Sequence, residues 1–278
     1  MRRLLRTRQL IAATASVVLA ATVAAGVSAL APSIAVGSAA MVPRPAIVRP
    51  VSASAPASAT GHAVRLDLTV PAELYWKLPV TSRVVALTFD AGSDLGYTVS
   101  MLNTLKAKGV HATFGITGDW ASAHPDMVRR MAAEGHQVMN HTMHHKSLTG
   151  VSSSNVLLGR SARQADVRQA DDIFTSLTGH TTVPFFRPPY GDTNASVQAD
   201  LGGIGYRFFI MWTIDTLGWH GMSASGIISR VITKVVPGAI IAGHVGSASQ
   251  DGPALGPMID ALRARGYSFV TVAEGFGV

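Results

Sequence analysis

The sequence predicts an α/β fold with a mainly parallel sheet, either open or closed into a barrel. Over residues 63–278, short runs rich in β-branched and aromatic residues alternate with longer amphipathic segments, a pattern typical of βαβ units. Glycines stand where several of these segments would end as helices, at Gly109, Gly135, Gly179 and Gly266. The composition agrees with a folded domain, because 47% of the residues are hydrophobic and can supply a core.

The expected elements follow one another along the chain. Seven strands are predicted, at Val84–Phe89, His111–Ile116, His136–Asn140, Val183–Arg187, Tyr206–Ile214, Ala239–His244 and Tyr267–Thr271. Helices are predicted between them, at Tyr97–Ala107, Pro125–Ala133, Asn155–Leu177, Ala195–Leu201, Ala224–Val235 and Leu255–Arg265. Strands joined by helices in this way run parallel, so their carboxyl ends meet at one edge of the sheet.

The net charge of +7 is concentrated at the N-terminus. Residues 1–62 contain six arginines and no acidic residue, whereas residues 63–278 contain 17 basic and 16 acidic residues. A near-neutral body argues against a basic nucleic-acid surface, so we expect no nucleic-acid partner. The lack of cysteine excludes disulfides and thiolate-ligated metals.

The N-terminal segment is predicted to direct the protein out of the cell. Four early arginines precede an apolar run over residues 10–31, which indicates a signal peptide within residues 1–31. The run is also long enough to stay as a membrane anchor. We expect residues 32–62 to form a Pro/Ala/Ser-rich linker, and residues 63–278 to form one domain with its core at 82–275. We expect an exported protein that is extracellular, cell-wall associated or membrane-anchored.

Polar residues of unusual kind follow the predicted strands at their carboxyl ends. They are Asp90, His141, His145, Arg187, Tyr190, Asp215 and His244. In (β/α) barrels this face carries the active site. A role in packing alone would scatter such residues over both ends, so the clustering predicts an enzyme.

The individual residues leave alternatives open. His141 and His145 are four residues apart, which on a helical turn places both rings on one side and suits one zinc-like ion. A structural or surface histidine pair fits the same spacing. Asp90 ends an apolar strand before a glycine turn, as a catalytic carboxylate or a plain turn residue would. Asp94 is expected to cap the helix that begins near Tyr97.

Five segments in this order resemble the polysaccharide deacetylases of the NodB-homology type, carbohydrate esterase family four. They are Thr88–Asp90, His141–His145, Arg187–Gly191, Asp215–Trp219 and Ala242–His244. Each motif alone is unspecific, but five in order at these spacings are specific. The resemblance extends from Ser82 to the C-terminus. It implies a distorted (β/α) barrel of about seven parallel strands and a metal-dependent removal of acetyl groups from N-acetylated sugars.

The resemblance also implies the acid–base residues. Asp90 would be the general base that activates the attacking water, and Arg187 would orient it. His244 would be the general acid that protonates the departing amine, and Asp215 would hold and tune it. An amide is a poor leaving group, so the reaction needs both a strong nucleophile and a proton for the nitrogen.

Metal and substrate residues are implied in the same way. His141 and His145 would hold a divalent ion, with zinc preferred and cobalt or nickel as alternatives. The Tyr190 backbone N–H would stabilise the oxyanion, and Trp219 would line the sugar groove.

The sequence departs from the family pattern at three places. Ala91 stands where the first motif usually has a second aspartate that binds the metal, so Asp94 or a water is the candidate replacement. Gly218 stands where the fourth motif often has another aspartate. Ala242 replaces the usual leucine of the fifth motif.

Two kinds of function are compatible with these residues. The first is an exported N-deacetylase of an envelope or extracellular polysaccharide, with peptidoglycan the preferred substrate and an acetyl esterase as a variant. The second is a catalytically silent sugar-binding protein of the same fold, suggested by Ala91. Retention of both the base and the acid favours the enzyme. We expect a monomer.

Overall fold

The computed structural model describes residues 71–153 and 156–278. Its strands are β1 Glu73–Tyr75, β2 Val84–Ala91, β3 Thr113–Ile116, β4 Gln137–Asn140, β5 Phe185–Phe186, β6 Phe208–Ile210, β7 Ile214–Asp215, β8 Ile240–His244 and β9 Ser268–Phe269. Its α-helices are α1 Thr98–Lys108, α2 Gly118–Ala123, α3 Pro125–Ala133, α4 Arg160–Thr178, α5 Ala195–Gly202, α6 Ala224–Lys234, α7 Asp251–Ala264 and α8 Val272–Phe276. Two 3₁₀ turns, η1 Pro189–Gly191 and η2 Gly218–His220, follow β5 and β7.

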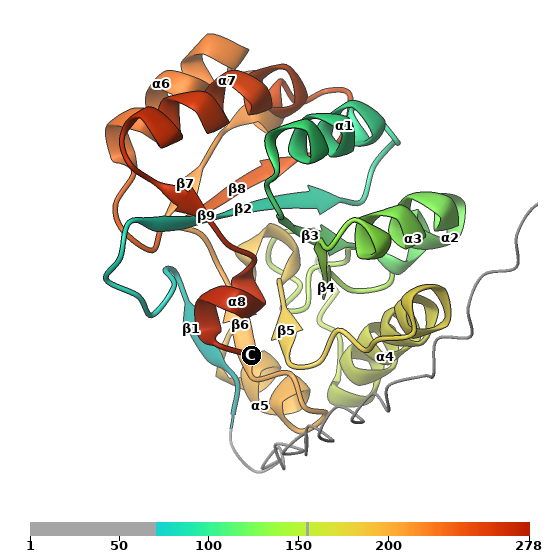
Figure 1. The fold of residues 1–278 in the computed structure, drawn as a ribbon. Helices are drawn as coiled ribbons and strands as arrows, with labels where there is room; N and C mark the ends of the chain where they lie inside the picture. Colours follow the sequence, from blue (N-terminus) through green and yellow to red (C-terminus); the bar gives the residue numbers. More distant parts are fainter. Residues whose placement is uncertain (1–70, 154–155) are drawn as a thin grey trace, which may run out of the picture. The chain divides into compact units, whose positions relative to one another are not determined.

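The strands form one parallel sheet that curls into a partly open barrel. The order is β1-β6-β5-β4-β3-β2-β8-β7, and β9 pairs with the start of β2. Helices α1 to α7 lie around the outside of the curled sheet, whereas residues of α8 pack with the strand residues inside it (Figure 1). Within residues 71–153 and 156–278, β1 and β7 are the two edges of the sheet, and one antiparallel bridge joins Lys77, after β1, to Ala239, just before β8. The predicted distorted (β/α) barrel is therefore confirmed.

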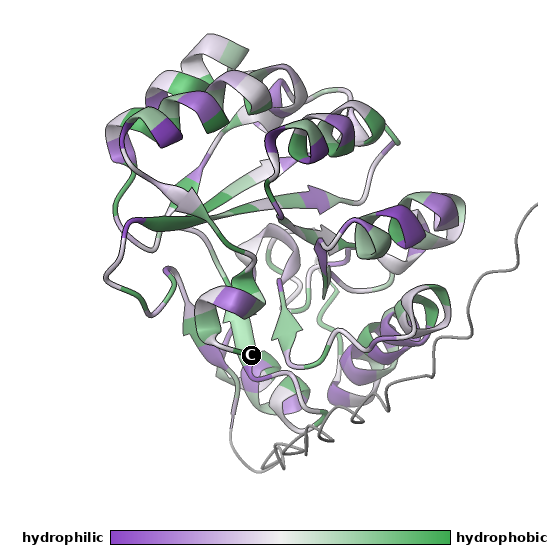
Figure 2. Cartoon of the chain, viewed as in Figure 1, coloured by the Kyte–Doolittle hydropathy of each residue, from purple (hydrophilic) through white to green (hydrophobic). Residues whose placement is uncertain are grey.

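Alternation along β2 sorts its side chains between two apolar layers. Val85, Leu87 and Phe89 are buried in the layer between the sheet and the helices, with residues of α1 and α7. Ala86 belongs instead to the cluster inside the curled sheet, with Ile240 of β8 and other strand residues. Figure 2 shows the strands mainly hydrophobic and the helices mixed along their length. Because side chains alternate along a strand, Asp90 lies on the same inner side as Ala86.

The observed elements differ from the predicted ones mainly at short segments. Each of the six predicted helices overlaps an observed one, but α2 and α8 were not predicted. The sheet has nine described strands rather than about seven, because β1 was missed and the predicted strand Tyr206–Ile214 divides into β6 and β7. The division occurs at Met211–Thr213, where Trp212 lines the cavity described below. β1 also lies before residue 82, where we expected the core to begin.

The N-terminal signal peptide or anchor (residues 1–31) and linker (residues 32–62) lie outside the described residues. Within the described residues, no helix has the length and apolar character needed to cross a membrane.

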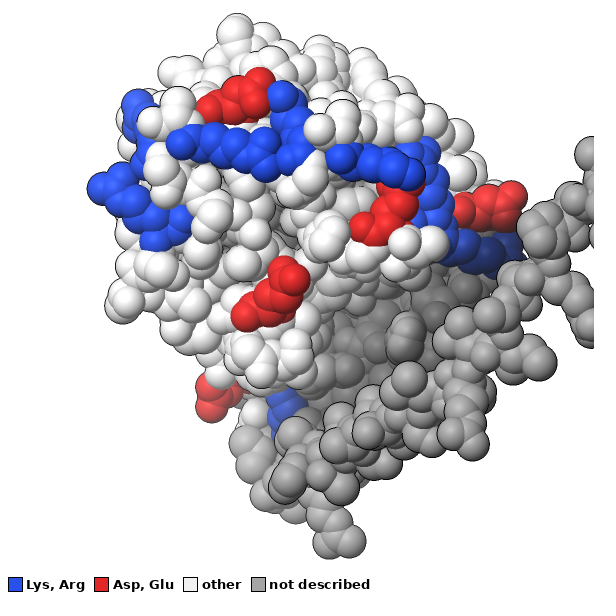
Figure 3. Space-filling view, in the orientation of Figure 1, with Lys and Arg blue, Asp and Glu red and all other residues white. Residues whose placement is uncertain are grey.

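Basic side chains on the face shown in Figure 3 lie close to acidic ones. Lys108 of α1 forms an ion pair with Asp260 of α7, with its Nζ 2.7 Å from Oδ1. Lys106 and Arg130 both contact Glu134, at 3.4 Å and 3.1 Å. Pairing of this kind reduces the local positive potential that a polyanion would need.

Candidate active site

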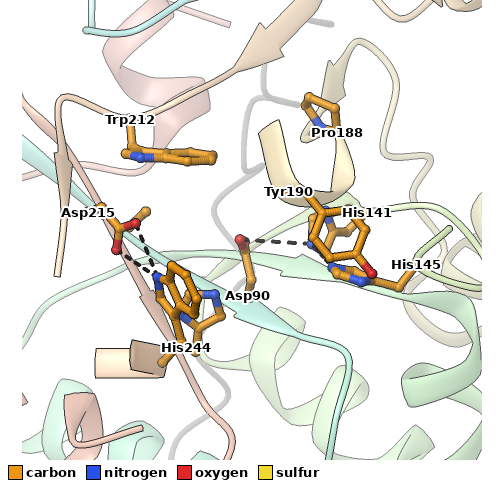
Figure 4. Close-up of a pocket in the computed structure, with 10 residues that line it drawn as sticks. Asp90, His141, His145, Pro188, Tyr190, Trp212, Asp215 and His244 are labelled. Atoms are coloured by element: carbon orange, nitrogen blue, oxygen red, sulfur yellow. Dashed lines mark hydrogen bonds and ion pairs between the residues drawn. The ribbon is translucent and has the colours of Figure 1, made fainter. Parts of the chain in front are cut away.

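A cavity of about 330 Å³ lies at the carboxyl ends of the strands. It is lined by Asp90, His141, His145, Pro188, Tyr190, Trp212, Asp215, Trp219, Ala242 and His244. Seven of the eight residues predicted from the sequence thus meet in one cavity, and the eighth, Arg187, is fully buried and contacts Asp90. Figure 4 shows Asp90 between His244 on one side and the two histidines His141 and His145 on the other.

Asp90 is held in place by the strands on both sides of it. It pairs in register with Gly115 of β3 and His244 of β8. A Cβ atom at Gly115 would lie 2.5 Å from Asp90 Oδ1, so only glycine leaves room for this carboxylate. Arg187 Nη1 donates to the same Oδ1 at 2.9 Å. The predicted contact between the base and its orienting arginine is therefore present.

Several charged groups together outweigh the effect of burial on the pKa of Asp90, and Arg187 is the largest of them. Burial alone raises the pKa of Asp90, but the nearby guanidinium, His141 and His244 together lower it below its ordinary value. Arg187 is itself fixed by the backbone, since its Nε donates to Ile210 O at 3.0 Å and its Nη2 to Met211 O at 3.3 Å. Asp90 is therefore an ionised carboxylate in a fixed position at neutral pH.

The two predicted metal-binding histidines meet, although not on a helical turn. Residues 141–147 form an irregular loop in which Thr142 and His145 have positive φ angles of 69° and 53°. The Asn140 side chain accepts from Thr142 N at 2.9 Å, and the Thr142 hydroxyl accepts from His145 N at 3.0 Å. This loop geometry brings the Nε2 atoms of His141 and His145 to 3.1 Å from each other.

The same two rings fit a divalent cation. His141 Nδ1 lies 2.8 Å from the Arg187 carbonyl, which can only accept, so the lone pair of His141 is on Nε2. Burial lowers the pKa of His141 and brings that of His145 to about 4, so both rings are neutral, as metal ligands must be. Two nitrogens bound at the usual Zn–N distance to one tetrahedral ion are about 3.3 Å apart. Within residues 71–153 and 156–278, however, no group of three His, Asp or Glu side chains forms a ligand set.

Three neighbouring positions add no further candidate metal ligand to His141 and His145 within the described residues. Ala91, at the place of the family's ligand aspartate, is fully buried at the end of β2. Asp94 does not line the cavity, because its carboxylate accepts from the Ser247 N–H at 2.8 Å and from the Ser247 hydroxyl. It also does not cap α1, whose N-cap is Tyr97 with no side-chain hydrogen bond. His144 points away from the pair, as expected, with Nδ1 2.9 Å from Asp119 Oδ2.

Tyr190 lines the cavity, and its backbone N–H has no acceptor among the described residues. Its φ of 61° is uncommon for a residue with a side chain, and its ring packs edge-on against His145 at 4.7 Å between centroids. In the described residues no acceptor is found for the Tyr190 N–H, whereas the next two N–H groups bond to Pro188 O and Pro189 O. An unpaired N–H facing a reaction site can stabilise a developing oxyanion.

Asp215 lies in the cavity but contacts other partners than expected. Its side chain accepts from Leu217 N at 2.8 Å and from Trp219 Nε1 at 3.2 and 3.3 Å. Asp215 therefore fixes the half-exposed Trp219 at the rim of the cavity. Within the described part of the chain no hydrogen bond joins Asp215 to His244, so the predicted tuning of His244 by Asp215 has no such contact to support it.

Sequence reasoning missed two residues next to the predicted ones. Trp212 lines the cavity, and the Arg187 guanidinium lies 5.8 Å from its ring. Its position inside an apolar run gave no polar signal. Asp251 opens α7, is fully buried, and accepts from His244 N at 2.9 Å. An acidic residue at the start of a helix is usually explained by its interaction with the helix dipole, so the sequence provided no reason to assign Asp251 to the site.

The family match and the similar proteins all indicate polysaccharide deacetylases. Residues 77–209 match the polysaccharide deacetylase family. A peptidoglycan-N-acetylglucosamine deacetylase of Bacillus cereus is 33% identical over 201 residues, which cover 71% of this chain and 70% of the relative. A second B. cereus protein of that name is 30% identical over 214 residues, covering 76% and 96%. The peptidoglycan-N-acetylmuramic acid deacetylase PdaA of Bacillus subtilis is 28% identical over 195 residues, covering 69% and 71%.

Solved structures agree with these relatives. The Bc1960 peptidoglycan N-acetylglucosamine deacetylase, crystallised with a hydroxamate-bearing naphthyl benzamide, is 30% identical with a TM-score of 0.68, covering 74% of this chain and 93% of that one. The T48 deacetylase with substrate is 30% identical with a TM-score of 0.62, covering 71% and 92%. The ordered motifs, the partly open barrel and these relatives lead to one conclusion: the chain belongs to the polysaccharide deacetylase family of NodB-homology proteins, carbohydrate esterase family four.

Proposed function

We propose that this protein removes acetyl groups from the N-acetylated sugars of peptidoglycan outside the cell. The observation that carries this proposal is the position of Asp90. A fixed, ionised carboxylate lies between a pair of convergent imidazoles and a third histidine, in one cavity with a free N–H. The two B. cereus relatives and PdaA are named peptidoglycan deacetylases, which supports this polymer as the substrate.

The residues of the cavity can carry out the hydrolysis in two proton transfers. Asp90 takes a proton from a water as the water oxygen attacks the acetyl carbonyl carbon, and the Tyr190 N–H donates to the oxygen that becomes negative. When the C–N bond breaks, His244 gives a proton to the nitrogen. The products are acetate and a free amine on the sugar.

His141 and His145 are the residues that would hold the divalent ion, for which we propose zinc. When bound, the ion polarises the acetyl carbonyl and makes water more acidic. With two imidazoles and no third protein ligand among the described residues, we expect weaker metal binding than at a site with three protein ligands.

Aromatic side chains extend the cavity along the rim of the sheet. Trp219 and Tyr190 are 54% and 50% exposed. Trp76 follows β1, is 52% exposed, and packs edge-on against Trp212 with ring centroids 6.4 Å apart. Aromatic faces bind the apolar faces of sugar rings. These positions favour a polymer, which occupies more than one sugar site, over a free monosaccharide.

We also propose that residues 1–31 export the protein and leave it free after cleavage or tethered to the membrane. The four early arginines and the apolar run over residues 10–31 support this proposal. A fusion of residues 1–62 to an alkaline phosphatase, which is active only after export, tests it. No phosphatase activity would refute export.

Acetate release by the purified full-length chain tests the enzymatic function. Peptidoglycan and chitooligosaccharides are incubated with added zinc or with a chelator. We expect release that falls with the chelator and drops by about 10²- to 10⁴-fold in Asp90→Asn and in His244→Ala, while the outward-pointing His144→Ala keeps wild-type activity. Binding of sugar without any release from either substrate would instead identify a silent sugar-binding protein.

A further inference from the structure

We infer that Asp251 is a positioning residue for His244: its carboxylate fixes the end of β8 that carries the imidazole and places a negative charge beside it. The inference rests on the proposed role of His244 as the acid. Four observations carry it: the partners of the carboxylate, the glycines around it, the buried nitrogen of His244, and the position of Asp215.

The Asp251 carboxylate is directed at β8 rather than at its own helix. Its Oδ2 accepts from His244 N at 2.9 Å and from Ser249 Oγ at 2.5 Å. Although Asp251 is the first residue of α7, the helix has no side-chain cap hydrogen bond. Capping α7 therefore does not account for the position of this side chain.

Two glycines from different elements make the space for this carboxylate. A Cβ at Gly243 would lie 2.9 to 3.1 Å from the Cγ and both oxygens of Asp251, and a Cβ at Gly218 would lie 2.6 Å from Oδ2. Neither glycine has a positive φ angle. Glycine is thus required at both positions for room and not for backbone conformation.

His244 has a buried ring nitrogen without a partner among the described residues. Its Nδ1 has no hydrogen-bond partner in the described part of the molecule, and the same is true of Asp251 Oδ1. A cationic imidazole buried without a compensating charge is costly. Asp215, the partner expected from the family pattern, is engaged with Leu217 N and Trp219 Nε1. Asp251 is the carboxylate that is hydrogen-bonded to His244 itself.

The pKa of Asp251 is raised above its ordinary value, and burial is the largest cause. The hydroxyl of Ser249, the N–H of His244, the hydroxyl of Thr216 and the charge of His244 act in the opposite direction.

The test compares two leaving groups in the full-length protein. Release of acetate from an N-acetylated chitooligosaccharide needs a proton on nitrogen, whereas 4-nitrophenyl acetate releases an anion that needs none. For Asp251→Asn, which keeps the shape and loses the charge, we expect kcat on the amide to fall at least tenfold with KM within about twofold. On the ester we expect kcat within about twofold of wild type. Asp260→Asn, on the exposed side of the same helix, is the matched control and should change neither rate.

A double-variant measurement shows whether Asp251 acts through His244. In a His244→Ala background, Asp251→Asn should have no further effect on the amide rate. If Asp251→Asn does not fold, Gly243→Ala replaces it, because the added methyl displaces the carboxylate and should reproduce the selective loss. Wild-type kcat on the amide in folded Asp251→Asn, or equal losses on amide and ester, would overturn the inference. Absence of acetate release by the wild-type chain from either substrate would instead refute the proposed function.

Discussion

Two pairs of histidines lie at opposite ends of the parallel strands. They share two properties that are often used to search for a metal site: close packing of the two rings and a lowered histidine pKa. His141 and His145 follow β4, whereas His111 and His136 precede β3 and β4. Both pairs pack edge-on, with centroids 4.8 Å and 6.0 Å apart. In each pair one ring has a pKa lowered to about 4, mainly by burial.

The pairs differ in where their nitrogens point. At the carboxyl ends the two Nε2 atoms converge to 3.1 Å beside a carboxylate that Arg187 holds ionised. At the amino ends His136 Nδ1 accepts from the Ala112 N–H at 3.1 Å, so its lone pair is already used, and its Nε2 is buried without a partner in the described residues. Burial and a depressed pKa therefore do not distinguish the site. The convergence of free lone pairs distinguishes it.

Replacing the arginine beside each pair should show the largest difference. Arg187→Met leaves the buried Asp90 without its charge partner and should cost about 3–5 kcal/mol of unfolding free energy, together with activity. Arg130→Met removes a partly exposed contact to Glu134 and should cost at most about 1 kcal/mol. Chemical denaturation measures both values. Equal costs would show that the two carboxylates are held alike.

The second largest difference is expected in zinc affinity, which should depend on the carboxyl-end histidine pair and not on the amino-end pair. His145→Ala removes one of two converging ligands and should weaken zinc binding by more than about 100-fold, since outer partners of a metal site alone contribute about 10- to 100-fold. His144→Ala, one residue away and pointing outward, and His136→Gln should leave the affinity unchanged. Competition with a chromogenic chelator measures the affinity without relying on activity. Zinc binding that survives His145→Ala would place the metal elsewhere.

The amino-end pair should reveal itself in the pH dependence of stability. Because the pKa of folded His136 is about 4 and that of an unfolded histidine is near 6.5, the unfolded chain binds more protons between these values. His136 therefore reduces stability as the pH falls from 6.5 to 4, with a slope of at most about 1.4 kcal/mol per pH unit. His136→Gln should remove this slope.

This pH prediction has an internal control. Above pH 7 His136 is neutral in both the folded and the unfolded chain. The unfolding free energies of wild type and His136→Gln should therefore change with pH in the same way in that range. Measurements with a chelator present keep the carboxyl-end pair free of metal. An unchanged slope between pH 4 and 6.5 would contradict the burial of His136.

The smallest effect is expected at the rim of the carboxyl-end cavity. Trp76→Ala should raise KM for peptidoglycan or a long chitooligosaccharide by about fivefold, or about 1 kcal/mol, through loss of apolar contact. The KM for the shortest substrate turned over should not change. Leu74→Ala, two residues earlier and within β1, is the control. A loss of affinity that is independent of chain length would show that Trp76 supports the fold and not a sugar.

The sequence predicted those elements well that have a regular hydrophobic pattern and a clear residue signal at their start or end. The apolar run of β2 ending on Asp90 and the proline-initiated α3 were predicted at or near their observed bounds, because burial and helix start signals are local. β1 and α8 have three and five residues, which is too short for a periodic pattern. Their stability comes from pairing with β6 and from packing inside the curled sheet.

The site was predictable in its residues but not in its contacts. Seven of the eight residues were placed at one end of the sheet by strand order alone, and Trp219 came from the family resemblance. The loop that joins His141 to His145 depends on two left-handed residues, Thr142 and His145, which the spacing does not signal. Asp251 escaped notice because its role depends on a distant strand end meeting the first turn of a helix.

The three glycines at 115, 218 and 243 have a consequence for how this enzyme can vary. None of them reacts, and none takes part in a hydrogen bond through a side chain, yet each leaves space that a carboxylate occupies. Substitution by alanine at these positions would act as a change at Asp90 or Asp251 while leaving both aspartates in the sequence. A variant library scored for activity should therefore show intolerance at positions that hold no functional group. Inspection for reactive side chains alone would leave such inactive variants unexplained.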